Sequence, residues 1–145
     1  MRSIERFFGA SLALVLIAMS TLWIPGDIAY GATLTVTNLN DSGAGSFRQA
    51  IADASSGDTI DFSTMGIIVL IGGELIIDKD LTIKGPDAVE LAVSGNNASR
   101  VFNVASAGAT VVISDITVQD GNSGGEDGGG IYNLGNLTIN NSVIK

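Results

Sequence analysis

Apolar and polar residues alternate over short segments along most of the chain. Residues 33–37 place an apolar side chain at every second position, which is typical of a half-buried β-strand. Three later segments share one order, in which two apolar residues flank a variable one and two polar turn formers follow: 75–79, 111–115 and 137–141. Each is followed by a second apolar pair, namely Leu81 and Ile83, Ile116 and Val118, and Val143 and Ile144. This pattern indicates short strands joined by polar corners.

The spacing of these segments predicts how the strands stack. A further strand-like element precedes two of them and carries Asn103 in one copy and Asn133, thirty positions later, in the other. Val111 and Leu137 are twenty-six positions apart. Repeats of this length are typical of a β-solenoid, whose coils bury each other's inward side chains and pair as parallel ladders. A β-sandwich also has many short strands, but it does not explain the recurring strand and corner with a matching Asn. We therefore predict an all-β solenoid.

One segment follows a helical pattern instead. Ser46 is a candidate N-cap with Gln49 three residues on, which is the arrangement of a capping box. Apolar residues then recur at helical spacing as Phe47, Ala50, Ile51 and Ala54. A lone amphipathic helix must lay this stripe against apolar side chains, so we expect it to cover the open end of the stack. We divide the chain into a leader over 1–31, a cap of one strand and this helix over 32–63, and coils over 64–145.

The leader has the three regions of a secretory signal peptide. Arg2 and Arg6 form a basic head, and residues 7–26 contain no charge and have a strongly apolar centre. Small residues, Ala29 and Gly31, then occupy the two positions that a signal peptidase inspects. We predict a cut after Gly31 and a secreted or cell-surface product. The alternative is an uncleaved membrane anchor, because the apolar stretch is just long enough to span a bilayer.

Composition excludes several classes of function. The 145 residues contain no Cys and no His, so disulfides, Cys/His zinc sites and His-dependent nucleophile systems are all excluded. The formal net charge is −8, with 15 acidic against 7 basic residues and no basic stripe, so we expect no nucleic-acid partner. An exported chain without cysteine favours a bacterial protein that is stabilised by packing. The 19 Gly residues fit many tight turns.

The carboxylates do not gather into one site under the predicted register. Asp78 falls one coil below Ser114 and two below Asn140, and these are residue types that corners prefer. We therefore assign no catalytic residue and no metal ligand, and we expect no cofactor. A calcium pair made by Asp78 and Asp80 is the open alternative. The glycine-rich stretch 124–130 lacks the nine-residue recurrence of calcium-binding coils and is interpreted as a corner loop.

Basic and aromatic residues leave few candidates for binding. Lys79, Lys84 and Arg100 are interpreted as solvated edge charges. We assign Phe47 and Phe62 to the core. Phe102 and Tyr132 fall at equivalent places in adjacent coils, where they form either an inner ladder or a small exposed aromatic stripe. This pair is the only binding surface that the sequence nominates, and glycans or a neighbouring cell surface are the expected partners.

Several stretches resemble the right-handed parallel β-helix proteins that bacteria export, which share the pectin-lyase-like fold. Residues 33–37, 41–51 and 57–62 resemble the amino-terminal opening of that group, where by resemblance the helix caps the first coil. Residues 128–133 and 137–142 resemble the glycine-rich coils of polymorphic outer-membrane proteins and related adhesins. The resemblance implies a right-handed parallel β-helix. This scaffold carries adhesins, passenger domains and polysaccharide-cleaving enzymes alike, so it leaves the activity open.

The last predicted coil leaves an apolar edge at 137–144. We therefore expect two to three coils, followed either by further coils in a longer surface protein or by end-to-end self-association. The functional prediction is an exported, non-catalytic module that acts as a structural or adhesin-type scaffold. The alternative is the amino-terminal part of a polysaccharide lyase or glycoside hydrolase whose active site lies in other coils.

Overall fold

The computed structural model describes residues 31–145, so all of the predicted signal peptide except Gly31 lies outside the described residues. The secondary structure consists almost entirely of short strands, with one helix near the start. In chain order the elements are β1 (Thr33–Val36), α1 (Phe47–Asp53), β2 (Asp58–Phe62), β3 (Gly66–Val69), β4 (Leu75–Ile77), β5 (Leu81–Lys84), β6 (Leu91–Ser94), β7 (Phe102–Val104), β8 (Thr110–Ser114), β9 (Thr117–Gln119), β10 (Ile131–Asn133), β11 (Asn136–Asn140) and β12 (Val143–Ile144).

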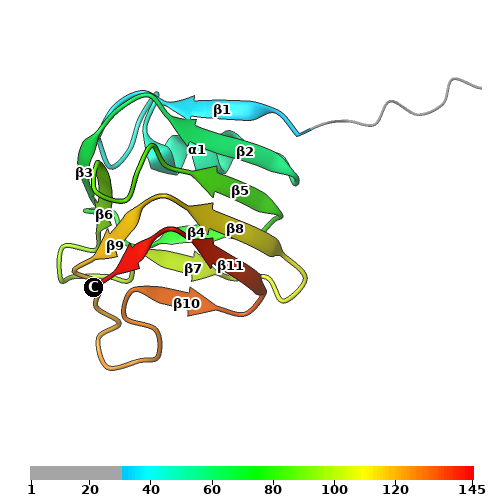
Figure 1. The fold of residues 1–145 in the computed structure, drawn as a ribbon. Helices are drawn as coiled ribbons and strands as arrows, with labels where there is room; N and C mark the ends of the chain where they lie inside the picture. Colours follow the sequence, from blue (N-terminus) through cyan, green and yellow to red (C-terminus); the bar gives the residue numbers. More distant parts are fainter. Residues whose placement is uncertain (1–30) are drawn as a thin grey trace, which may run out of the picture.

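These strands build a parallel β-solenoid, as the sequence predicts, and the solenoid has about four turns (Figure 1). Each of the coils β2–β4, β5–β7 and β8–β10 contributes one strand to each of three sheets, whereas β1 at one end and β11 with β12 at the other belong to incomplete coils. The sheets have the orders β1-β2-β5-β8-β11, β3-β6-β9-β12 and β4-β7-β10, and every pairing is parallel. Parallel pairing follows from the winding, because the chain returns to each sheet in the same direction once per coil. Figure 1 shows the five-stranded sheet descending from β1 to β11.

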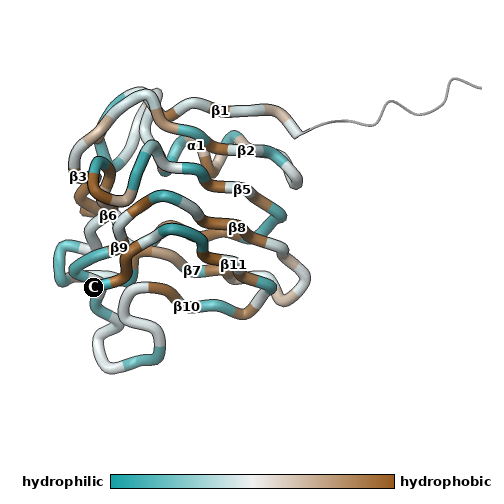
Figure 2. Tube along the Cα trace, viewed as in Figure 1, coloured by the Kyte–Doolittle hydropathy of each residue, from teal (hydrophilic) through white to brown (hydrophobic). Residues whose placement is uncertain are grey.

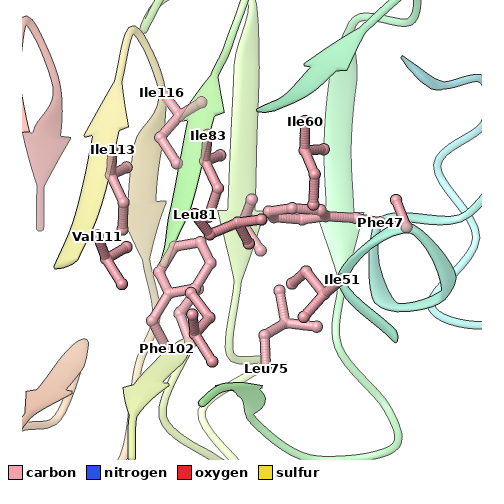
Figure 3. Close-up of a cluster of buried hydrophobic side chains, with 14 of the residues drawn as sticks. Phe47, Ile51, Ile60, Leu75, Leu81, Ile83, Phe102, Val111, Ile113 and Ile116 are labelled. Carbon is pink, nitrogen blue, oxygen red and sulfur yellow. The ribbon is translucent and has the colours of Figure 1, made fainter. Parts of the chain in front are cut away.

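The core is a column of aliphatic side chains inside the coils. Ile60, Ile83 and Ile113 lie in register on β2, β5 and β8, and each is fully buried. Figure 3 shows these side chains side by side in a row across the interior, with Leu81 and Val111 nearby. Their neighbours along each strand point outward, as period-two alternation requires. Burial of such side chains provides the main stabilisation, at about 25 cal/mol per Å² of apolar surface.

Helix α1 covers the core at the β1–β2 end of the solenoid, as predicted. Its stripe residues Phe47, Ala50 and Ile51 are buried, and the Phe47 ring meets Phe62 edge-on at 4.9 Å between centroids. Only half of the predicted capping box forms. The Ser46 hydroxyl accepts from the Gln49 amide at 3.2 Å, whereas the Gln49 side chain donates to Asp53. At the other end, the Lys79 ammonium donates to two carbonyl oxygens, those of Ile51 and Ala54, and so caps the helix.

Two details of the predicted repeat are wrong. The segment 75–77 pairs with β7, and Leu81 of β5 is the true partner of Val111. Residues 75–77 and 81–83 have the same alternation of apolar and variable positions. Because this alternation occurs more than once in every coil, it does not show which of the two segments pairs with β8. The number of coils is also larger than the predicted two to three. Strands β2–β4, β5–β7 and β8–β10 form complete coils, and β1 at one end and β11 with β12 at the other add partial ones.

The opposite end of the solenoid is more exposed. Within the described residues β11 pairs only with β8, and β12 pairs only with β9. Several apolar side chains of this last turn are accessible to solvent, and Figure 2 shows the matching brown bands on β11 and near the carboxyl end: Leu134, Ile139, Val143 and Ile144. Between Gly31 and Lys145 no helix is both long and apolar enough to span a membrane.

Candidate functional site

The outer face of the three-stranded sheet brings polar and aromatic side chains together. Ile76, Asn103 and Tyr132 are direct neighbours across β4, β7 and β10. All three point away from the core, because the residues on either side of Ile76 and Asn103 are buried inward. We call this surface, together with Glu74 and Arg100 at its border, the Tyr132 face.

Arg100 lies across the aromatic ring on this face. Its guanidinium carbon is 5.1 Å from the centroid of the Tyr132 ring, which is cation–π geometry. The Arg100 Nε atom donates to the Asp127 carbonyl oxygen at 2.9 Å, and Nη1 is 3.5 Å from Glu74 Oε2. Contacts to three different segments hold the guanidinium in one place, and the guanidinium in turn orients the ring.

Glu74 and Asn103 form the polar half of the face. The Asn103 side-chain amide donates to Glu74 Oε1 at 2.7 Å, so the two carboxylate oxygens of Glu74 are shared between Asn103 and Arg100. Asn103 Oδ1 is buried and accepts no hydrogen bond from the protein atoms between Gly31 and Lys145. An unpaired buried carbonyl oxygen is costly, so this face carries a local energetic penalty at Asn103.

A groove beside α1 continues the same surface. It has a volume of about 280 Å³ and runs between the helix and β4, where it shares Glu74 and Ile76 with the Tyr132 face. Arg48 of α1 lines it, together with Asp78 and Lys79, which follow β4. Much of the charge on Arg48 is already committed to Asp41 and to the carbonyl oxygens of Gly73 and Glu74. A ligand in this groove would therefore contact mainly apolar side chains, and the Arg48 charge would contribute little to its binding.

The predicted pairing of Phe102 with Tyr132 is wrong by one residue. The partner of Phe102 on β10 is Ile131, and Tyr132 pairs with Asn103. Since adjacent residues of a strand point to opposite faces, this shift puts Phe102 inside and Tyr132 outside. Phe102 is fully buried and meets the Phe47 ring edge-on at 5.9 Å. Of the two nominated residues, only Tyr132 lies on the outer face, and neither an inner ladder nor an aromatic stripe forms.

The carboxylates are dispersed among corner positions. The column that contains Ser114 and Asn140 continues through Lys84 to Asp61, and it does not include Asp78 as predicted. Asp80 accepts a hydrogen bond from the Thr110 amide of the next coil at 2.7 Å. Across residues 31–145 no three acidic side chains come close enough to form a metal site. Asp115 has a φ of 61°, the left-handed conformation of a turn.

Sequence reasoning missed four members of the face, namely Ile76 and three polar or charged residues. Glu74 and Asn103 were not nominated, and Arg100 was interpreted as a solvated edge charge although only 19% of its side chain is exposed. A signal was present for Asn103, because a polar residue between inward-facing Phe102 and Val104 has to point outward. Nothing local indicates that Glu74 and Arg100, twenty-six residues apart, would meet between adjacent coils.

Comparison with known proteins adds no further evidence, because no family model, curated protein or solved structure matches the chain.

Proposed function

We propose that this chain is an exported, non-catalytic solenoid that presents the Tyr132 face to glycans at a cell surface. The observation that carries the proposal is the stacked pair of Arg100 and Tyr132 on the outer face of the sheet, with Asn103 in register beside the ring. A flat, partly exposed aromatic ring matches the apolar face of a sugar ring. Amide and carboxylate groups at its edge match the hydroxyl groups.

The scaffold suits this role because it holds the face without a flexible hinge. Parallel hydrogen-bond ladders hold the strands that carry Ile76, Asn103 and Tyr132. The central strand, β7, pairs with both β4 and β10. Their inward neighbours, such as Leu75, Ile77 and Val104, are fully or almost fully buried. A surface that is already ordered loses little conformational entropy when it binds a ligand, which favours binding through few contacts.

The test is glycan binding by the exported full chain, measured by isothermal titration calorimetry against pectate and against neutral plant and bacterial polysaccharides. We expect binding to at least one polymer. Tyr132→Ala should weaken it about tenfold or more, because the loss of an aromatic contact costs on the order of 1.5 kcal/mol. Tyr132→Phe keeps the ring and should stay within about threefold of the unmodified chain.

Val89→Ala is the matched control, since Val89 is 90% exposed and is not part of the Tyr132 face. If Tyr132→Ala binds as tightly as Val89→Ala, the Tyr132 face is not the binding surface. Incubation with pectate and calcium supplies a second criterion. The release of unsaturated oligosaccharides would show a lyase and overturn the non-catalytic assignment. Recovery of the uncut chain from the cytoplasm would contradict export.

A further inference from the structure

Asp58 is the only ionisable residue among the buried polar side chains of residues 31–145, and it lies at the start of β2. Both of its carboxylate oxygens are engaged by backbone amides. Oδ1 accepts from the Ala32 nitrogen at 2.7 Å, and Oδ2 accepts from the Ser55 nitrogen at 2.7 Å. The carboxylate therefore bridges the segment before β1 to the loop after α1.

No cation pairs with Asp58 within the described part of the chain. The ion pairs there join Arg48 to Asp41, Lys79 to Asp78 and Arg100 to Glu74. A buried carboxylate is costly unless it is neutralised or well hydrogen-bonded, and a cationic partner is the strongest compensation available. Within the described residues, the Asp58 carboxylate thus accepts two short hydrogen bonds from backbone amides but has no positively charged partner.

The position of Ala32 supplies the missing cation. Removal of residues 1–31 would turn the Ala32 nitrogen from an amide into a primary ammonium group, with the same atom already 2.7 Å from Asp58 Oδ1. We propose that Asp58 is the docking site for the α-ammonium group of Ala32 after processing, an inference that rests on the proposed export. The Ala32 carbonyl oxygen also accepts from the Thr59 amide at 2.8 Å, so the new terminus is held on both sides of its α-carbon.

Gly31 packs closely against the chain next to Asp58. A Cβ atom at position 31 would overlap the Gly57 carbonyl group, so only glycine passes this point without displacing the chain. Residue 31 is therefore packed against the residue that precedes Asp58. The uncut chain has a neutral amide at this site, whereas the processed chain has an ion pair. Folding would gain this ion pair only after export and cleavage.

Ala32 is itself exposed whereas Asp58 is buried, and this combination suits an ammonium group. One of its three protons can point to the carboxylate while the others remain hydrated. The ammonium then keeps most of its hydration, and the ion pair avoids the large desolvation cost of a fully buried one.

The experiment begins with the full chain expressed in a bacterium. N-terminal sequencing of the exported product should give Ala32 as the first residue. The terminal α-amine is then converted to a ketone by mild transamination with pyridoxal phosphate, which leaves the lysine ε-amines intact. We expect this treatment to lower the Tm by about 5 °C or more, because it removes a charge-assisted hydrogen bond.

The same treatment applied to Asp58→Asn should change the Tm by less than about 1 °C, since the charged acceptor is already absent. An equal fall in both proteins, or no fall in either, would overturn the docking site. If Asp58→Asn does not fold, carbodiimide coupling decides, because it joins only amines and carboxylates in direct contact. Peptide mapping should then find Ala32 linked to Asp58, and linkage of the amine to another carboxylate would overturn the proposal.

Export and docking fail in distinguishable ways. If the cell does not process the chain, a full chain carrying A29E, Y30G and G31R provides the site Ile-Glu-Gly-Arg at residues 28–31 for cleavage in solution, directly before Ala32. The G31R side chain displaces the uncut chain at Gly57, but it is removed with residues 1–31, so the cut protein is unchanged from Ala32 onward. The transamination experiment then runs unchanged on the cut protein. A positive result there with no export in the cell would retain the docking site and reject the proposed export.

Discussion

The Arg48 guanidinium on α1 donates a 2.7 Å hydrogen bond to the Asp41 carboxylate in the loop between β1 and the helix. The second oxygen of Asp41 accepts from the Gly72 amide at 2.9 Å. Arg48 also donates to the carbonyl oxygens of Gly73 and Glu74. This pair therefore fastens the cap to the turn between β3 and β4, and α1 cannot move away from the first coil without breaking it.

The pair makes part of the stability depend on pH. Burial acts to raise the pKa of Asp41, but the hydrogen bonds from Arg48 and the Gly72 amide outweigh it and hold the pKa below the ordinary value of 3.8. A carboxylate with a lowered folded-state pKa contributes stability above its ordinary pKa and loses it as the pH falls through the folded-state value. We therefore expect the Asp41 contribution to begin to fall below about pH 4 and to disappear as the pH drops through the lower folded-state pKa.

Asp41→Asn should lower the free energy of unfolding by about 1 to 2 kcal/mol at pH 7, because a charged hydrogen-bond acceptor becomes neutral. Urea unfolding from pH 7 down to pH 2 should show a smaller acid-induced loss in this variant than in the unmodified chain. The control is Asp127→Asn, which removes a carboxylate from an exposed loop position. Equal acid sensitivity of Asp41→Asn and the unmodified chain would contradict the assignment.

Neighbouring isoleucines on β4 separate the contributions of the core and the surface. Ile77 is fully buried, whereas Ile76 is 56% exposed on the Tyr132 face. We expect Ile77→Ala to cost about 2 to 5 kcal/mol, because it removes buried methyl groups and leaves a cavity in the stacked column. Ile76→Ala should cost less than about 1 kcal/mol. Urea titration compares the two directly, and similar losses would mean that the register of β4 is wrong.

Close stacking of the coils requires glycine at position 85. The Gly85 amide donates to the Ser114 carbonyl oxygen of the next coil at 2.9 Å, and a Cβ atom here would overlap the carbonyl group of Asp115. Gly85→Ala should therefore destabilise the protein by about 2 kcal/mol or more. Gly108→Ala is the matched control, since a Cβ atom there meets nothing within 4 Å, and it should be neutral or slightly stabilising. Thermal unfolding of both variants checks this.

The exposed edge of the last coil is the expected site of self-association. Ile139 on β11 is 38% exposed, and α1 covers the opposite end of the core, so we expect two copies to meet through their β11 edges and not to form open filaments. Sedimentation equilibrium should show concentration-dependent association, and Ile139→Asp should abolish it. Met65→Asp, which places the same charge at a more exposed site in the loop between β2 and β3, should leave association unchanged. A monomer at all concentrations would contradict this prediction.

Elements with a local cause were predictable from the sequence alone. The stripe of Phe47, Ala50 and Ile51 behind the Ser46 cap specifies a helix and its buried face, and the structure confirms both. Short alternating segments specified strands and their inward side chains, as at Ile83 and Ile113. These features depend on backbone periodicity and on capping groups within a few residues, and both are written in the local order of side chains.

The tertiary structure alone decided which strands pair and what meets on the outer face. Each coil repeats similar apolar triplets, so the local pattern fits several registers equally well, and one residue of shift exchanges inside for outside. The packing of whole coils resolves this choice, and it places Ile131 beside Phe102 and leaves Tyr132 to meet Arg100. The contacts of Asp58 with Ala32 and of Arg100 with Glu74 likewise span about one coil. Such contacts depend on the length and path of every intervening corner, which no short stretch of sequence specifies.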